Sequence, residues 1–328
     1  YSGRFYESVQ MTGRIDFPSR LPLFLAADVT YNHFNYYKTS SIFIENPHPT
    51  YIEQSDRKIN LNIGMPLNRN TRIIVGTAFV NNNDRYSPNN TFAVGDELEK
   101  TILNGSRSTV SFEQYTFNRK QYANRGRHFL FSANYFTGRE SYTPGNIVGI
   151  SGSAIAAKIP VTKKFRQWVN IKLSDENYFL RINKYTLGYQ AEAVFSNQPL
   201  FSNYYSTLLA APAFYPLQDS KSIFLENFRA TTYLAGGLKN VYSLKRNLDL
   251  RVEGYVFLPH REFEKIGFQD VKHRSPFTKW HYAGTAGLVY HTPLGPISFS
   301  YNIYDNPIKR NGVLLHLGYL IYNKRSLE

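Results

Sequence analysis

The chain has 328 residues, no cysteine and a formal net charge of +14. It contains no run of eighteen or more apolar residues, so a membrane-spanning helix is not readable in it. The mean hydropathy of −0.40 resembles that of a soluble protein, but strands that show lipid only every second side chain also average to a polar value. The aromatic share of 16% favours strands.

The basic charge points to no nucleic-acid partner. Lys and Arg are scattered through turns and alternate strand positions, without a dense basic run or a nucleic-acid-binding motif. Basic side chains of this distribution suit a charged lumen or contacts with anionic lipid headgroups. The absence of cysteine fits an oxidising export route. The first residue, Tyr1, is not an initiator Met, so we expect a mature product or a fragment.

Strict alternation of apolar and polar residues is the main structural signal, and it predicts strands. After a first readable strand at about 3–16, the alternating segments are 59–65, 187–195, 248–258, 297–304 and 313–321. In 248–258 the even positions are apolar or glycine, whereas Asp249, Arg251 and Glu253 face the other way. Most of these segments are about nine to fourteen residues long, nearer to the roughly nine to eleven of membrane strands than to the roughly five to six of soluble ones.

The predicted connections alternate between short and long. Short ones lie near 18–21, 67–70, 174–178, 242–246 and 292–295, and long ones near 38–55, 81–107, 141–165, 259–278 and 304–312. Short turns on one side and long loops on the other are typical of outer-membrane barrels, with the short turns periplasmic. At roughly twenty residues per strand and connector, the chain predicts about sixteen strands.

The first strand leads into a short turn, so it would begin outside the cell. A complete barrel with an even number of strands would begin and end in the periplasm. Either the pattern therefore misses one strand, or the chain begins after a first strand. The stretch 198–228 is the least readable part. No linker or repeat divides the chain, so we expect one domain over 1–328, either complete or the C-terminal part of a longer protein.

The C-terminal part carries recognisable motifs. Residues 282–288 read Tyr-Ala-Gly-Thr-Ala-Gly-Leu, 292–296 read Thr-Pro-Leu-Gly-Pro before an alternating strand, and 316–319 read His-Leu-Gly-Tyr. Pro293 and Pro296 fix backbone angles, and Gly295 permits a tight turn. The set resembles the final strands of the barrel-assembly and surface-antigen superfamily of outer-membrane proteins. That resemblance implies an outer-membrane location, lipid contact, insertion by barrel-assembly machinery and handling of a polypeptide passenger.

Within that superfamily the chain looks most like the C-terminal barrels of patatin-like phospholipases of Bacteroidetes. The similarity lies in 228–230, in 236–238 and in the tail 316–328. It implies that Leu327 and Glu328 are native, that a hydrolase domain lies upstream and that the barrel anchors or translocates it. It also implies a weak seam between the first strand and the strand 312–322, which Gly312 and Gly318 would loosen.

The superfamily usually carries an Arg-Gly-aromatic motif on a loop inside the lumen. Here the nearest match is Phe228-Arg229-Ala230, without the glycine. The resemblance implies that Arg229 faces inward and pairs with a wall carboxylate such as Glu253 or Asp249. The alternative is an ordinary residue at a strand end.

No catalytic, cofactor or metal site is predicted. Residues 149–153 read Gly-Ile-Ser-Gly-Ser, which fails the Gly-x-Ser-x-Gly pattern of a nucleophile elbow. A hydrolase embedded in the barrel would need a Ser, a His and an orienting partner, and the candidates are His281, His291, Ser298, Ser300 and His316. No triad can be selected among these five. The His residues also lack metal-ligand spacing.

The sequence therefore predicts an all-β fold, a single transmembrane antiparallel β-barrel, acting as a translocator or membrane anchor for an upstream patatin-like phospholipase domain. Two alternatives remain. A passive diffusion porin predicts a wide channel with a charged constriction, whereas the translocator predicts a plugged or narrow lumen with Arg229 inside. A soluble β-rich binding domain predicts solubility without detergent.

Overall fold

The computed structural model describes residues 6–17, 21–36, 52–87, 97–145, 160–267, 269–306 and 310–328. Thirteen strands form one antiparallel sheet, in which chain neighbours pair throughout except that β10 pairs with β13. The strands of this sheet are β1 (Tyr6–Phe17), β2 (Leu23–Tyr36), β3 (Ile52–Asn68), β4 (Thr71–Tyr86), β5 (Glu99–Tyr115), β6 (Gly126–Thr143), β7 (Thr162–Ile182), β8 (Tyr185–Ser196), β9 (Tyr233–Lys245), β10 (Leu248–Pro259), β13 (His281–Thr292), β14 (Gly295–Tyr304) and β15 (Asn311–Leu317).

Two smaller parts complete the fold. A separate hairpin, β11 (Phe263–Ile266) and β12 (Asp270–His273), lies in the connection between β10 and β13. The connection between β8 and β9 contains α1 (Tyr204–Ala210) and the 3-10 turns η1 (Ser220–Ser222) and η2 (Glu226–Phe228). None of the helices in the described ranges is long and apolar enough to cross a membrane.

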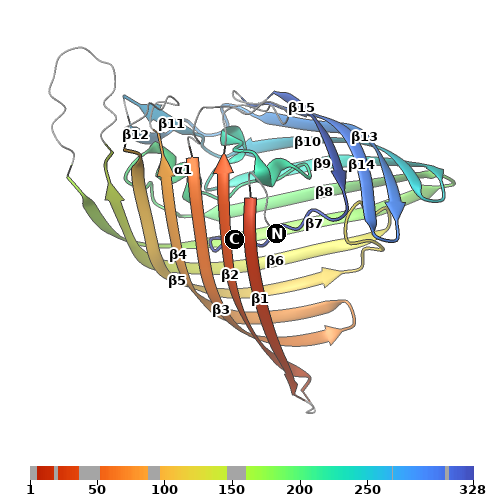
Figure 1. The fold of residues 1–328 in the computed structure, drawn as a ribbon, viewed down its shortest axis with the longest axis horizontal. Coiled ribbons are helices and arrows are strands. Elements are labelled where there is room, and N and C mark those ends of the chain that lie inside the picture. The colour runs from red at the N-terminus through yellow and green to blue at the C-terminus, as the bar shows by residue number, and fades with distance from the viewer. Residues whose placement is uncertain are drawn as a thin grey trace.

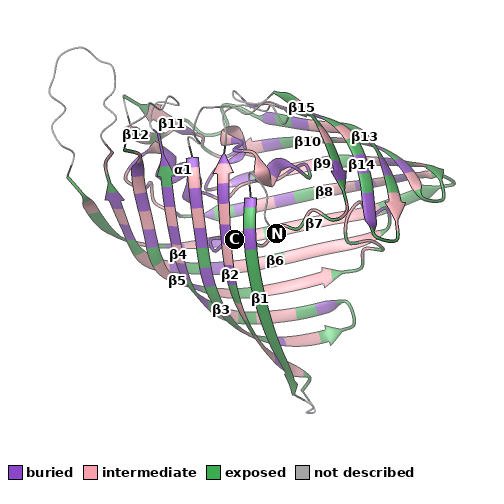
Figure 2. Cartoon of the chain, in the orientation of Figure 1, coloured by how far each residue is buried: buried purple, intermediate pink, exposed green. Residues whose placement is uncertain are grey.

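The predicted alternation is confirmed, and it gives the sheet two unlike faces. In β10, Asp249, Arg251 and Tyr255 are buried, whereas Leu250 and Val252 are exposed. The same change of burial from residue to residue runs along most strands in Figure 2. The outward face of β3–β5 is a belt of exposed aliphatic and aromatic residues, namely Ile59, Leu61, Ile63, Val75, Phe79 and Val110. A sheet that is apolar on its outer face and polar on its inner face is suited to a lipid bilayer.

The sheet curls around an interior, as Figure 1 shows. Within the described residues β1 pairs only with β2, and β15 pairs only with β14, so these two strands are the edges of the sheet. The all-β antiparallel prediction is confirmed. The described residues contain fifteen strands, thirteen of them in the main sheet, against the predicted number of about sixteen. Strands such as β7, with 21 residues, are longer than the average that was assumed.

Some predicted connections are wrong. The stretch 174–178 lies inside β7, and the turn comes later, where Asn183 has φ of +51°. Its residues were mistaken for a turn because Ser, Asp, Glu and Asn favour turns, but here their side chains face the polar interior or neighbouring strands. Likewise, most of 81–107 belongs to β4 and β5. The turns near 67–70 and 292–295 are confirmed. Residues 18–20 and most of 38–55 lie outside the described residues.

The last strand is also shorter than predicted. Pairing of β15 with β14 ends at Leu317, so Tyr319 and Ile321 are not strand residues. Gly318 has φ of +82°, a conformation that glycine adopts without steric cost. The seam strand predicted over 312–322 is therefore corrected to 311–317, and Gly318 turns the chain away from the sheet instead of weakening it.

We expect Leu61→Arg, in the middle of β3, to destabilise the barrel by about 2–4 kcal/mol in lipid vesicles, because charge on the lipid face near the bilayer midplane is costly. The measurement is the urea midpoint for loss of the fast-migrating folded band on a gel. Leu294→Arg is the control, because Leu294 lies in the β13–β14 turn and is 92% exposed. Equal midpoints for the two variants would contradict a lipid-facing belt.

Candidate functional site: the occupied lumen

The connection 197–232, called the plug below, contains a helix built by its own capping residues. Asn203 Oδ1 accepts a hydrogen bond from Ser206 N at 2.8 Å, and Asn203 N donates to Ser206 Oγ at 3.1 Å. This reciprocal capping satisfies donors that a helix start leaves unpaired. Asn203 Nδ2 also donates to Glu99 Oε2 of β5 at 3.3 Å. One residue therefore starts α1 and ties it to the wall.

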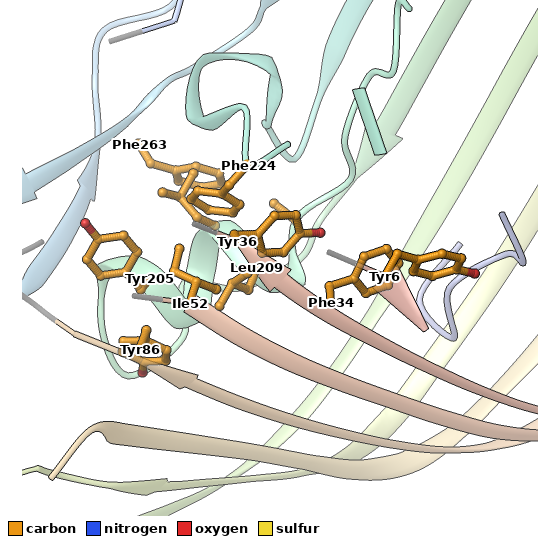
Figure 3. Packing of buried hydrophobic residues seen from close by; sticks show 11 residues of the cluster. Tyr6, Phe34, Tyr36, Ile52, Tyr86, Tyr205, Leu209, Phe224 and Phe263 are labelled. Carbon is orange, nitrogen blue, oxygen red and sulfur yellow. The ribbon is translucent and has the colours of Figure 1, made fainter. Parts of the chain in front are cut away.

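Apolar packing holds the plug against opposite parts of the sheet. Figure 3 shows the first cluster, in which Tyr205 and Leu209 of α1 pack with Tyr36, Ile52 and Tyr86 of β2–β4. The second cluster joins the rest of the plug to the other side of the barrel. Its members from the plug are Phe214, Leu217, Leu225, Phe228 and Ala230, and those from the wall are Val194, Tyr233, Tyr255, Phe257, Ala283 and Tyr304. The plug thus spans the interior.

The connection between β5 and β6, residues 116–125, also enters the lumen, and we call it the inner connection. Asn118 Oδ1 accepts from the backbone nitrogens of Asn124 and Arg125, both at 3.2 Å. Arg251 of β10 donates to Ala123 O at 2.9 Å. Arg119 Nη1 lies 3.0 Å from Asp249 Oδ2. Ring contacts add to these polar ones: Phe117 packs on Tyr178 with ring centres 5.9 Å apart, and the Tyr122 ring stacks on His316 at 5.6 Å.

Residues 318–328, called the tail, are the third segment in the lumen. In Figure 1 the end of the chain lies within the curl of the sheet, beside the start of β1. Asn323 N donates to the Tyr6 hydroxyl at 2.9 Å. Arg325 Nη2 donates to Leu209 O of α1 at 2.8 Å. The tail consequently lies between the wall and the plug.

The structure places Arg229 in the plug, with 4% of its surface exposed. Its Nη1 donates to Leu208 O at 3.1 Å, and its guanidinium carbon lies 4.9 Å from the centre of the Phe224 ring. The expected pairing with Glu253 or Asp249 is wrong. Arg229 packs on α1 and Phe224 near the β2–β4 wall, away from those carboxylates on β10.

Both carboxylates have other partners, and both support the inner connection. Glu253 Oε1 lies 2.8 Å from Arg251 Nε, and Arg251 in turn holds Ala123. Asp249, which is 1% exposed, contacts Arg119 and accepts from Ser243 Oγ at 2.8 Å. Alternation correctly put these side chains inside, but the inner connection that they support lies 128–130 positions away in the sequence.

The predicted turn residues meet at one point of the fold. Gly295 has φ of +133°, and a Cβ on it would lie 2.9 Å from Gly318 Cα. Gly318 N donates to Pro296 O at 2.8 Å. Pro293 lies in the turn between β13 and β14. The turn at 292–296 therefore shapes the exit of the tail as well as the hairpin.

One Ser–His pair forms among the residues considered for a hydrolase. Ser298 Oγ lies 2.7 Å from His316 Nδ1 and 3.0 Å from the Tyr122 hydroxyl. His316 Nε2 has no hydrogen-bond partner within the described part of the chain, and Ser298 is 1% exposed. This geometry lacks the orienting group and the accessible nucleophile of a triad. It supports packing of the inner connection.

The remaining candidates are dispersed. His281 contacts Asp305 at 2.7 Å and Glu262 at 2.8 Å, whereas His291 contacts Asp249 at 2.9 Å. Ser300 lines a wall cavity. The near-elbow at 149–153 lies outside the described residues.

The space left between these segments is small and polar. Two adjoining cavities of about 330 and 520 Å³ lie beside Lys239, Arg251 and Glu253. Lys239 Nζ is 2.6 Å from Glu176 Oε1, so the charges there are paired. The plug, the inner connection and the tail thus occupy the lumen around them, with polar pockets at their contacts, whereas β1 is exposed on both faces from Val9 to Phe17.

No protein-family model matches the sequence, and a comparison with curated proteins finds no match. Among solved structures, BamA from Haemophilus ducreyi lacking POTRA domains 1–3 is similar, with a TM-score of 0.55 at 10% identity, covering 95% of this chain and 61% of that one. CdiB from Acinetobacter baumannii gives 0.46 at 13% identity, with 94% and 49% covered. BauA, the ferric preacinetobactin receptor of Acinetobacter baumannii, gives 0.42 at 10%, with 90% and 46% covered.

The likeness to BamA shows a shared fold, and this chain spans about three-fifths of the BamA chain's length (61%). The remaining two scores are too low to add to that statement.

We expect the docking of the plug to depend on pH through Glu226. Burial raises the pKa of this carboxyl to about 7, against the opposing effect of Lys265 and Arg229, whereas its ordinary value is 4.5. Docking therefore takes up a proton: it is most favourable below pH 4.5, weakens as pH rises toward about 7 and is constant above. The measured quantity is the rate of trypsin cleavage after Lys221 in the wild type, divided by the rate in Glu226→Gln at the same pH. This ratio should be several-fold higher at pH 8 than at pH 5.5. An unchanged ratio between the two proteins would contradict this assignment.

Proposed function

We propose that this chain is an outer-membrane β-barrel of the barrel-assembly and surface-antigen superfamily that moves or inserts polypeptide. The observation that carries the proposal is a lumen filled by the plug, the inner connection and the tail, inside a sheet whose edge strands β1 and β15 pair with no further strand among the described residues. The fold shared with BamA supports it.

The filled lumen argues against a passive porin. A diffusion channel needs a water-filled path, and here Phe214, Leu217 and Phe228 of the plug are buried against the wall. Because the plug is held by non-covalent contacts, a substrate chain that makes similar contacts with the wall can displace it. A filled, openable lumen suits a translocator better than a pore for small solutes.

The outward belt argues against a soluble binding domain. Phe79 is 69% exposed and Leu315 is 65% exposed on the outer face. Contiguous apolar surface on this scale marks a lipid or protein interface. We therefore place the chain in a bilayer, and the outer membrane is the bilayer in which such barrels occur.

The finer form of the proposal is that the barrel anchors or translocates an upstream patatin-like phospholipase. It is supported by the sequence resemblance in 228–238 and in the tail. The comparison with curated proteins found no match and does not add to this support. If it is correct, the full gene product isolated from outer membranes hydrolyses phospholipid, while residues 1–328 alone do not. A full product without hydrolase activity would remove the lipase and leave the barrel proposal intact.

The translocator role is tested by locking the plug. Thr162 Oγ1 of β7 lies 3.4 Å from Ser202 Oγ of the plug, and the chain has no cysteine of its own. Thr162→Cys with Ser202→Cys therefore introduces a single reducible pair of thiols. The barrel is placed in vesicles that contain a trapped protease, and an unfolded reporter protein is added outside. We expect the protease to degrade the reporter when the vesicles carry the wild type. With the oxidised variant the rate of degradation should fall about tenfold, and reduction should restore it.

The two single-cysteine variants are the controls, and neither should respond to oxidant. Degradation that is unaffected by the disulfide would show that the plug need not move. No degradation by any form would overturn the translocator and leave an anchor. A large steady ion conductance in planar bilayers would instead favour the porin.

A further inference from the structure

Four polar residues stand in register across the inner face of the first strands. Ser8 pairs with Asn32, Asn32 with Asp56, and Asp56 with Asn82, so one polar side chain comes from each of β1, β2, β3 and β4 at the same level. All four are buried, with exposures of 0–4%. We call these residues the polar row. It starts at β1, an edge strand of the sheet.

The tail crosses the strands along this row. Asn323 Nδ2 donates to Ser8 Oγ at 2.5 Å. Next along the tail, Lys324 O accepts from Asn32 Nδ2 at 3.3 Å. Ser326 N then donates to Asp56 Oδ2 at 2.8 Å, and Ser326 Oγ donates to Asn82 Oδ1 at 2.5 Å. The contacts advance along the tail in the order of the strands.

Flanking cations extend the row and bind the same backbone. Lys58 of β3 donates to Lys324 O at 2.7 Å. Arg107 of β5 donates to Ser326 O at 2.8 Å and also to Glu328 O. The tail makes these contacts in two parts: residues 323–325 carry no helix, strand or turn, and residues 325–328 form a turn in which Glu328 N donates to Arg325 O at 3.2 Å. The turn brings Ser326 O and Glu328 O to the same guanidinium of Arg107.

Most of these contacts are to the main chain of the tail. Asn323 N, Lys324 O, Ser326 N, Ser326 O and Glu328 O are all bound by wall side chains. Only Asn323 and Ser326 use their own side chains toward the row. Groups that contact main-chain atoms impose little preference on sequence, as in the addition of a strand to a sheet edge.

The fit of the tail is incomplete. Two wall atoms of the site, Asp56 Oδ1 and Arg107 Nε, are buried without a hydrogen-bond partner in the described part of the protein. Buried polar atoms without partners are costly. A different segment that satisfies these two atoms would compete with the tail.

We propose that the polar row is a binding site for a polypeptide segment of varied sequence, that the tail occupies it in the resting state, and that an incoming passenger segment displaces the tail. This inference rests on the proposed function for the identity of the passenger. It adds the site, the recognition of main-chain atoms and the self-occupied state.

The test is peptide binding to the full chain in detergent, measured by fluorescence anisotropy. The probe is a fluorescein-labelled peptide that copies residues 321–328. Ser326→Pro removes the N–H that Asp56 accepts, so it should free the row and raise peptide affinity at least tenfold over the wild type. Adding Arg107→Met should reverse the gain, whereas adding Arg85→Met should not, because Arg85 is half-exposed and lies outside the row.

Two further peptides test what the row recognises. A scrambled peptide of the same composition should bind within about threefold of the copy, and a copy with N-methyl groups on its backbone should bind at least tenfold more weakly. A scrambled peptide that fails to bind would overturn general polypeptide recognition.

A reversible lock keeps the test independent of the proline variant. Asn82→Cys with Ser326→Cys should form a disulfide that holds the tail in place. The oxidised protein should bind no peptide, and the reduced protein should bind it. Binding that persists in the oxidised form, or absence of binding in both the reduced form and the Ser326→Pro variant, would overturn the inference.

Failure here and failure of the proposed function are separable. Peptide binding without reporter degradation in vesicles would leave the site and remove the translocator. Reporter degradation without peptide binding would remove the binding site and leave the translocator.

Discussion

A curled sheet whose strands alternate between lipid and lumen has an inner surface that must be hydrogen-bonded by something. Here that surface carries charges such as Asp56, Lys58 and Arg251, all nearly inaccessible to solvent. Leaving such groups without partners would cost several kcal/mol each. Some of the partners are other wall residues, as for Arg251 and Glu253, and three segments of the chain supply the rest. The outer apolar belt and the filled interior are thus two consequences of one alternating pattern.

The segments are held with different strengths. The plug buries large apolar side chains such as Leu209 and Phe228, each contributing on the order of 2 kcal/mol. The tail is held mainly by hydrogen bonds, whose net contribution is about 1 kcal/mol each because water offers replacements. Its apolar contacts are fewer than those of the plug: Leu327 packs with Phe201 and Ala210, and the Tyr322 ring lies 5.2 Å from that of Tyr6. A competing chain in the lumen would therefore exchange with the tail more readily than with the plug.

How much the sequence could predict depended on the range of each interaction. Alternation is local, so the inward positions of Asp249 and Glu253 and the turn at Pro293 were readable from neighbours alone. The partners of Arg229 and the path of the tail depend on residues tens to hundreds of positions away, which a pattern does not encode. The polar composition of 174–178 led to the wrong prediction of a turn. Glu176 belongs to strand β7, and its side chain pairs with Lys239 of β9 on the inner face of the sheet.

The contacts also impose an order on opening. Arg325 donates to Leu209 O, and Leu327 packs on Phe201 and Ala210, so the tail supports the side of α1 that faces the interior. Removing the tail takes these contacts from the plug, whereas removing the plug first would require breaking both apolar clusters while the tail still held α1. A chain entering past β1 meets Ser8, the first residue of the polar row, before it meets the plug. Under the proposed function, release of the tail therefore comes first and lowers the cost of moving the plug.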